Sequence, residues 1–234
     1  MDPLAGSPWS DPSTVAGFAK SLPNDTLIAF ATQELRPGAR ALDIGCGAGR
    51  NAVPLAEMGW DVAAIDLSWP MLEAATARAR RADVEARVHP VLAPMEHLPI
   101  ADASIDFVVA HGIWNLARSS AEFRRGVAEA ARVAKPGAAL FIFTFSRHTL
   151  PPDATPLDGE PFVFTQFSGN PQCFLTEAQL VDELRTAGFE SDASVPLTEY
   201  NRRQPGSVPT GAPVLYEAAF RRSERSRALE KPSQ

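Results

Sequence analysis

The sequence predicts an α/β fold: a doubly wound, seven-stranded and mostly parallel sheet with an antiparallel pair of strands at its C-terminal edge. Three observations predict this fold. Short apolar segments alternate with helical patterns along most of the chain, as expected of a parallel sheet covered by helices. A glycine-dense turn joins the first apolar segment to a helix. The last two apolar segments have no helix between them, so we expect them to pair antiparallel.

Caps, stops and apolar spacing indicate the elements up to residue 92. Residues 1–12 are rich in Pro, Ser and Gly and are expected to be irregular. Asn24 and Ser68 are typical helix N-caps, and Gly59 is a typical residue just past a helix end. Helices are predicted over 25–35, 50–59 and 68–81. Short apolar strands are predicted over 40–44, 62–65 and 88–92.

The same signals indicate the remaining elements. The turn Lys135-Pro136-Gly137 ends a helix. The apolar run after it is expected of a strand buried on both faces. Thr176-Glu177-Ala178-Gln179 has the pattern of a capping box, and Gly188 ends that helix. Helices are therefore predicted over 121–133 and 176–188. Strands are predicted over 105–110, 138–145, 189–195 and 214–220.

Length and charge limit the class of protein. A chain of 234 residues suffices for one large α/β domain, and no repeat or long linker divides it. The net charge of −6 and the pI near 5.3 give no basic surface for nucleic acid. We expect an N-terminal lid or helical segment, a main domain containing one insertion, and a disordered tail. Their expected bounds are 1–36, 37–221 with the insertion at 146–175, and 222–234.

The two cysteines and the N-terminus indicate the compartment. Cys46 and Cys173 have no metal-ligand spacing, and a disulfide between a ligand turn and a remote loop is not expected. A reduced protein of the cytoplasm, without a metal, is therefore predicted. No signal peptide is seen, and no apolar run approaches the roughly 20 residues of a membrane helix. We therefore expect no membrane partner.

The turn at 45–49 predicts a site for a nucleotide-type ligand. Glycine has no Cβ, so the backbone there can adopt positive φ and lie against a ligand. Arg50 occupies the position where a dinucleotide-binding fingerprint has its third glycine, and no phosphate-binding G-x-x-x-x-G-K-[ST] motif is present. Asp43, just before the turn, argues against a phosphate ligand and for one that carries positive charge.

These motifs resemble those of the class I S-adenosylmethionine-dependent methyltransferases, over roughly residues 40–190. The run 42–49 resembles the family's first motif, and Asp66 stands where the family binds the ribose hydroxyls. Leu98-Pro99 and the following run 104–109 are similar to the family's "LPF…DASFDVV" segment, and Lys135-Pro136-Gly137 is similar to its "KPGG" turn. The resemblance implies a Rossmann-like sheet, methyltransferase activity and S-adenosyl-L-methionine as the methyl donor.

The resemblance also implies which residues bind the donor. Backbone groups of the 45–49 turn would lie beside the methionine part, and Asp43 would orient the turn or meet the ammonium group. Asp66 would accept both ribose hydroxyls in a charge-assisted pair. Leu67 would pack on the adenine, close to the loop at 95–96. The full expected set is Asp43, Gly45, Cys46, Gly47, Gly49, Arg50, Asp66, Leu67, Met95, Glu96 and His111.

Several of these residues have a purely structural alternative. Arg50 could pin the donor's carboxylate or face solvent in the first helical turn. Glu96 could be a plain surface residue, and Cys46 a small filler of the turn. His111 borders the methionine part and is a candidate general base, with a packing role as the alternative. His148 is the second candidate base, and no other catalytic residue is predicted.

Three segments are expected to form the walls of the acceptor pocket. Residues 9–18 could fold over the site as a lid. Trp114 and Asn115 should face the acceptor, although Trp114 could equally belong to the core. The insertion at 146–175 carries several aromatic side chains, which suggests an apolar acceptor site. The alternative for the insertion is a flap that only covers the sheet.

The expected reaction is in-line displacement of the methyl group by a nucleophile on a small-molecule acceptor. Holding the reactants close and aligned can supply up to about 7–11 kcal/mol. A general base is needed only if the nucleophile arrives protonated. The acidic balance gives no support to a nucleic-acid acceptor. A monomer or a homodimer is expected.

Other functions remain open from the sequence. Gly49-Arg50-Asn51-Ala52 and Gly59-Trp60-Asp61-Val62 are similar to runs in thiol- and tellurite-handling methyltransferases. A catalytically silent protein that binds S-adenosylmethionine or S-adenosylhomocysteine as a regulator is a second alternative. A nicotinamide-dependent oxidoreductase is the third, and Arg50 in the third-glycine position disfavours it.

Overall fold

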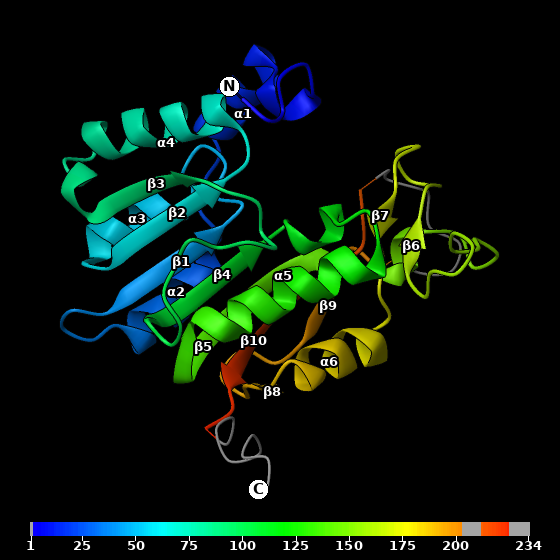
Figure 1. Ribbon diagram of the computed structural model, residues 1–234. Helices are drawn as coiled ribbons and strands as arrows, with labels where there is room; N and C mark the ends of the chain where they lie inside the picture. Colours follow the sequence, from blue (N-terminus) through cyan, green and yellow to red (C-terminus); the bar gives the residue numbers. More distant parts are fainter. Residues whose placement is uncertain (1, 203–211, 225–234) are drawn as a thin grey trace, which may run out of the picture.

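The computed structural model describes residues 2–202 and 212–224 and contains one large mixed sheet and one small hairpin (Figure 1). The strands are β1 (Arg40–Ile44), β2 (Asp61–Asp66), β3 (Val88–Leu92), β4 (Ile105–His111), β5 (Ala134–Phe145), β6 (Val163–Phe164), β7 (Gln172–Cys173), β8 (Phe189–Ser191), β9 (Thr198–Tyr200) and β10 (Leu215–Arg222). The α-helices are α1 (Pro12–Ala19), α2 (Asp25–Glu34), α3 (Ala52–Met58), α4 (Trp69–Arg81), α5 (Ser120–Val133) and α6 (Glu177–Thr186).

The large sheet has the strand order β3-β2-β1-β4-β5-β10-β8, and β9 pairs with β10 outside that path. β1 to β5 pair in parallel. β10 runs antiparallel to β5, β8 and β9. The predicted doubly wound, mostly parallel sheet with an antiparallel C-terminal edge is therefore confirmed. β9 adds an eighth strand, and β6 with β7 forms a separate hairpin in the insertion.

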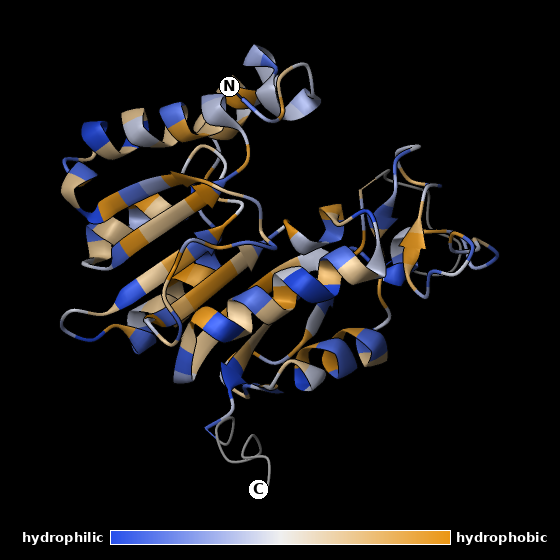
Figure 2. Cartoon of the chain, in the orientation of Figure 1, coloured by the Kyte–Doolittle hydropathy of each residue, from blue (hydrophilic) through white to orange (hydrophobic). Residues whose placement is uncertain are grey.

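Helices cover both faces of the sheet and bury two apolar layers. On one face, α2, α3 and α4 pack against the sheet, and helix side chains such as Phe30 and Leu55 share one apolar layer with Phe107 of β4. On the other face, α5 and α6 contribute to a second layer that includes Phe123 and Leu180. Figure 2 shows the central strands as mainly hydrophobic, with hydrophilic residues on the outer sides of the helices. This pattern is expected where strands are buried on both faces.

The helix caps predicted from the sequence form as expected. The side chains of Asn24 and Ser68 accept backbone N–H groups in the first turns of α2 and α4. Thr176 and Gln179 form the capping box of α6. α1 begins with Asp11 as its N-cap and Pro12 in its first turn, a signal that could have located this helix in the sequence.

Two strand boundaries differ from the prediction by more than two residues. Lys135-Pro136-Gly137 belongs to β5 rather than to a turn before it, and the pairing with β4 shifts register at this point. The Lys135 ammonium donates to both carboxylate oxygens of Asp106 at 2.8 Å, which ties this irregular segment to β4. The strand predicted over 189–195 ends at Ser191, because the Asp192 side chain accepts the Ser194 amide in a local turn.

The described part of the chain tests only some of the expected segments. Arg222 ends β10, so it belongs to the sheet rather than to the predicted tail. Residues 225–234 of that tail lie outside the described residues.

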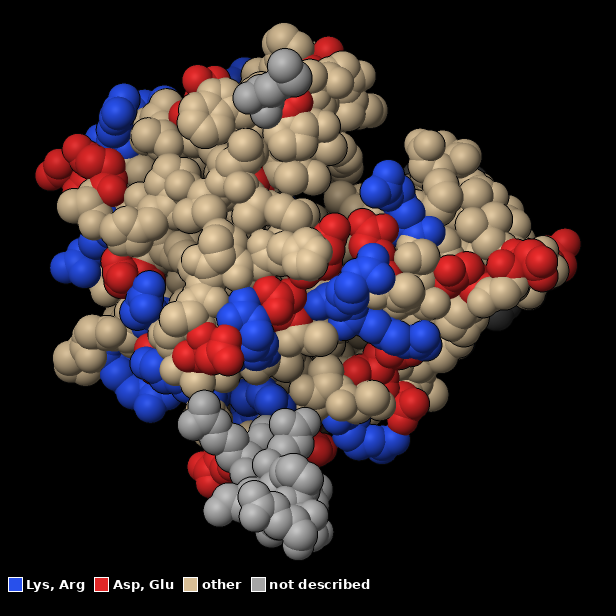
Figure 3. Space-filling view, in the orientation of Figure 1, with Lys and Arg blue, Asp and Glu red and all other residues tan. Residues whose placement is uncertain are grey.

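Within the described residues, no helix has both the length and the apolar composition needed to cross a bilayer. On the face shown in Figure 3, acidic and basic side chains are intermixed, with pairs such as Arg124–Glu183 over α5 and α6.

The direction in which strands are added to the sheet reverses between β1 and β4. From β1 the chain continues to β2 and β3 on one side, and β4 then pairs with the other side of β1. In open α/β sheets, ligands bind at such a switch point, beyond the carboxyl ends of the strands. This is the position of the glycine turn that follows β1.

Candidate functional site

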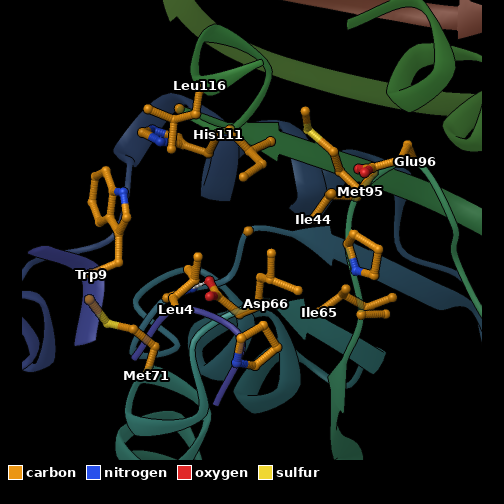
Figure 4. A pocket seen from close by; sticks show the side chains of 18 of the residues that line it. Leu4, Trp9, Ile44, Ile65, Asp66, Met71, Met95, Glu96, His111 and Leu116 are labelled. Atoms are coloured by element: carbon orange, nitrogen blue, oxygen red, sulfur yellow. Dashed lines mark hydrogen bonds between the residues drawn. The ribbon is translucent and has the colours of Figure 1, made fainter. Parts of the chain in front are cut away.

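A cavity of about 620 Å³ opens at the carboxyl ends of the parallel strands. This volume lies within the roughly 300–1,000 Å³ typical of small-molecule sites. Figure 4 shows Asp66 projecting from one side, with His111 and Leu116 on the opposite side. Trp9 lies at one end of the cavity and Glu96 at the other. Of the eleven residues expected to bind the donor, the cavity is lined by Gly45, Gly47, Arg50, Asp66, Leu67, Met95, Glu96 and His111.

The glycine turn is shaped by the end of β2. The amides of Gly45 and Cys46 both donate to the Ile65 carbonyl, at 2.8 and 2.9 Å. Gly45 adopts φ +70°, and a Cβ on it would lie 2.8 Å from atoms of the Ile113 side chain. Ile113 itself lines the cavity. The turn therefore requires glycine at this position for both its conformation and its packing.

Asp66 connects the turn to the start of α4. One carboxylate oxygen accepts the Gly47 amide at 2.8 Å, and the other accepts the Ser68 amide at 2.8 Å. Each oxygen keeps a further lone pair that can accept from a ligand in the cavity. Burial raises the pKa of Asp66, against the lowering effect of these two backbone hydrogen bonds. Two fixed amides therefore aim the carboxylate at the cavity.

Asp43 lies beneath the turn and does not line the cavity. Its side chain is almost fully buried in β1, and neither carboxylate oxygen has a hydrogen-bond partner among the described residues. Burial raises the pKa of Asp43 to about 7, although the nearby Arg50 cation opposes the shift. Asp43 therefore lies behind the turn rather than at the cavity, and its expected role in orienting the turn or meeting the donor's ammonium group stays a prediction.

The Asp43→Asn variant is expected to become more stable relative to the wild type as the pH rises. The folded wild type keeps Asp43 protonated up to about pH 7, whereas the unfolded chain ionises it near its ordinary pKa of 3.8. Wild-type stability therefore contains a contribution that is present below pH 4 and lost by pH 7. The loss is on the order of 4 kcal/mol, and asparagine lacks it. Urea unfolding of both proteins between pH 4 and 8 measures this difference.

Asp106→Asn is the matched control, with the opposite sign. Burial acts to raise the pKa of Asp106, but hydrogen bonds from Lys135 and the Arg40 amide outweigh it and lower the pKa. This variant should lose stability relative to the wild type as the pH rises through the acid range. Parallel pH curves for Asp43→Asn and the wild type would contradict the buried, protonated state of Asp43.

His111 lies at the end of β4 and stacks on Phe143, with ring centroids 4.2 Å apart. The Arg50 guanidinium lies 2.7 Å from its Nδ1 and 3.1 Å from its Nε2. Burial, together with the Arg50 charge, lowers the pKa of His111 to about 3. The ring is therefore neutral near pH 7 and too weakly basic to serve as a general base there.

The N-terminal segment forms one wall of the cavity. Trp9 and Phe18 line the cavity and meet edge to face, with centroids 5.9 Å apart. The Ser68 hydroxyl, which also caps α4, donates to the Trp9 carbonyl at 3.0 Å. Ser68 thus contacts both Asp66 and the segment expected to act as a lid.

Several residues expected at the site lie elsewhere. Cys46 packs into the layer beneath α2, α3 and α4, and Gly49 packs against Ala75 of α4. Trp114 and Asn115 are buried and do not line the cavity, and Trp114 packs in the apolar layer on the α5 side, as expected of a core residue. Both cysteines are buried and free.

The insertion does not line the cavity among the described residues. Phe162 belongs to the main core, while Phe164 and Phe174 form a small cluster with Leu150. His148 is held by Glu199 of β9, 2.7 Å from its carboxylate, and lies outside the cavity. These contacts hold the segment after β5 beside β9, and they keep His148 away from the cavity, which does not favour its expected role as a base.

Part of the cavity wall is formed by residues that the sequence does not single out. Leu4, Met71, Ile113, Leu116 and Phe143 also line it. Phe143 stands near the carboxyl end of a predicted parallel strand, and that position alone could have indicated it. Among the described residues, no group of three or more His, Cys, Asp or Glu side chains could hold a metal ion.

Comparisons with known proteins agree with this geometry. A family described as "Methyltransferase domain" matches residues 42–142. A demethylmenaquinone methyltransferase of Renibacterium salmoninarum is 32% identical over 62% of this chain, and the match spans 60% of that protein. The 27-O-demethylrifamycin SV methyltransferase of Amycolatopsis mediterranei is 30% identical over 83% of this chain and 69% of its own. A solved S-adenosylmethionine-dependent methyltransferase of Methanosarcina mazei shares the fold, with a TM-score of 0.67 and 23% identity, covering 83% of this chain and 97% of its own.

Proposed function

Because this chain belongs to the class I S-adenosylmethionine-dependent methyltransferases, we propose that it methylates a small, largely apolar organic acceptor in the cavity beside the glycine turn. The observation that carries the proposal is the joint position of Asp66, Arg50 and the turn on one cavity. Leu116 lies on the side opposite Asp66, and Ile113, which also follows β4, lines the cavity together with the charged Arg118 and Glu122. The apolar side chains of this wall suit an apolar acceptor.

The lining residues suit a donor with a carboxylate, an ammonium group and ribose hydroxyls but no phosphate. Asp66 would accept from the ribose hydroxyls through the lone pairs that its two backbone partners leave free. Arg50 has no ion-pair partner among the described residues, so its cation is available to the donor's carboxylate. Leu67, Met95 and Glu96 would border the adenine. Arg50, in the position of the third glycine of a dinucleotide-binding turn, disfavours a nicotinamide cofactor.

The chain's contribution to the reaction is orientation. The bound donor supplies an electrophilic methyl group on a positive sulfur, and this charge disperses during transfer. With His111 neutral and weakly basic and His148 outside the cavity, neither candidate base is placed to take a proton. We therefore propose an acceptor whose nucleophile is already unprotonated or ionised near pH 7. Alignment of the two reactants would then provide most of the rate acceleration.

The names of the relatives guide the choice of acceptors. One acts on demethylmenaquinone and another on 27-O-demethylrifamycin SV. We propose a ring-bearing acceptor of comparable apolar character. We further propose that residues 9–18 close over the bound donor, since Trp9 and Phe18 stand at the cavity.

A methyl-transfer assay tests the proposal. Purified protein is incubated with S-adenosylmethionine carrying a radiolabelled methyl group and with hydroquinones, phenols, amines, thiols and tellurite. Label is expected in an aromatic acceptor whose nucleophile is unprotonated or ionised near pH 7, and the Asp66→Ala protein serves as the inactive control. Transfer to thiols or tellurite would favour the thiol- and tellurite-handling subgroup instead. Donor binding without transfer to any acceptor would favour a silent regulatory protein, and binding of NADH alone would refute the proposal.

A further inference from the structure

A row of side chains crosses three strands behind the cavity. His111 of β4 is the register partner of Phe143 of β5, and Phe143 is the partner of Glu217 of β10. Glu217 is only 4% exposed. Among the described residues it forms no ion pair, although a buried carboxylate is normally paired with a cation. This buried acid therefore requires an explanation that core packing does not provide.

Asn24 joins Glu217 to His111. Its Oδ1 accepts the Leu27 amide at 2.8 Å as the N-cap of α2, which fixes the orientation of the side-chain amide. Its Nδ2 therefore faces the other way, donating to Glu217 Oε2 at 2.7 Å and lying 3.3 Å from His111 Nε2. The Tyr200 hydroxyl donates to the second oxygen of Glu217 at 3.1 Å. Both carboxylate oxygens are thus occupied.

His111 in turn holds Arg50. A guanidinium can only donate hydrogen bonds, so at least one imidazole nitrogen must present a lone pair to it. Phe143 covers one face of the ring and Asn24 meets its Nε2 edge, which limits the orientations open to His111. A neutral hydrogen-bond acceptor orients the guanidinium and leaves its positive charge in place. A carboxylate would orient the guanidinium but would also neutralise its charge. Arg50 therefore stands at the cavity as an oriented cation with its charge available.

We infer that Asn24 and Glu217 are positioning residues of the donor site: through His111 they orient Arg50 toward the carboxylate of the donor. Arg50 has a long and flexible side chain, and fixing it before binding lowers the entropy that binding must remove. The inference rests on the proposed function, because it requires a donor that carries a carboxylate. It extends the site to two residues that lie outside the cavity and 193 positions apart in the chain.

The test compares two probes that differ at the carboxylate end. S-adenosylhomocysteine keeps the amino and carboxylate groups, and 5′-methylthioadenosine lacks both. Asn24→Ser is the main variant, because serine is also a favoured N-cap but is too short to bridge Glu217 and His111. Glu217→Gln is the second variant and preserves side-chain size. Thr176→Ala is the control, since it removes the N-cap of α6 far from the cavity.

Both variants are expected to bind S-adenosylhomocysteine about ten-fold more weakly, as measured by titration calorimetry, and 5′-methylthioadenosine as the wild type does. Thr176→Ala should bind both probes normally, although it also unfolds more readily. In an Arg50→Gln background, adding Asn24→Ser should cause little further loss, because the two residues act through the same contact.

Each other outcome overturns the inference. Equal weakening for both probes would show general loosening of the site rather than loss of carboxylate binding. Unchanged affinity for S-adenosylhomocysteine in both variants would refute the positioning role while leaving the proposed function intact. If the losses of affinity caused by Arg50→Gln and Asn24→Ser are additive, Asn24 affects donor binding by a route that does not involve Arg50. A wild-type protein that binds neither probe would refute the proposed function, and the inference with it.

Discussion

Replacing Asp66 with alanine is expected to lower the affinity for S-adenosylmethionine about 100-fold or more. A hydrogen bond to a charged group contributes roughly 1.5–3 kcal/mol, and the proposed pairing with the ribose uses two of them. The substitution also releases the amides of Gly47 and Ser68, so the turn and the start of α4 lose a shared anchor. Titration calorimetry with S-adenosylmethionine and S-adenosylhomocysteine measures the loss.

Asp61→Ala is the matched control, because Asp61 is the first residue of β2 and Asp66 is the last. The Asp61 side chain is 42% exposed and contacts Arg40 and His89, away from the cavity. This control should bind the donor normally. Equal donor affinity in the two variants would show that Asp66 does not hold the ribose.

Gly45→Ala is expected to lower the free energy of unfolding by about 2–5 kcal/mol, and to abolish donor binding. A left-handed backbone costs a residue with a Cβ roughly 1–2 kcal/mol. The new Cβ would also lie 2.8 Å from three atoms of Ile113, an overlap that adds about 1–3 kcal/mol. Relief of the clash would push Ile113 into the cavity that it lines. Urea unfolding and calorimetry with S-adenosylhomocysteine check the two effects.

Gly38→Ala separates the two contributions. Gly38 has φ +72°, nearly the value of Gly45, but a Cβ there would meet nothing within 4 Å. This variant should lose only the backbone contribution and should bind the donor as the wild type does. If both variants were equally destabilised, close packing against Ile113 would not be what requires glycine at 45.

The parts of the site that are local in sequence could be predicted from it. The glycine turn, Asp66 and the loop at 95–96 each lie at or just beyond the end of a strand, and parallel strands bring their carboxyl ends to one edge. The contacts around His111 could not be predicted in the same way. The sequence indicates Asn24 only as a helix cap, and Glu217 is one residue of the strand predicted over 214–220, with no motif of its own. Their contact depends on β10 entering the sheet beside β5.

For the aromatic residues, the sequence does not determine whether a side chain belongs to the core or to the cavity. The aromatic side chains of the insertion and Trp114 indicate an apolar wall, and Trp114, Phe162, Phe164 and Phe174 are buried, whereas Phe167 is 42% exposed. Hydrophobicity alone does not determine which surface covers a residue, because the core and a ligand cavity both favour aromatic side chains. Here the core takes Trp114 and Phe162, while the N-terminal segment supplies Trp9 and Phe18 to the cavity.

The position of β10 has a consequence for synthesis of the protein. It is the last strand in the described part of the chain, yet it lies between β5 and β8. On the ribosome, β5 must therefore wait with one edge unpaired while about seventy further residues are made. β5 is mostly apolar, and an unpaired apolar strand edge promotes aggregation in nascent chains. A polypeptide interrupted before residue 215 would lack this strand and should be a substrate for chaperones rather than a smaller folded enzyme.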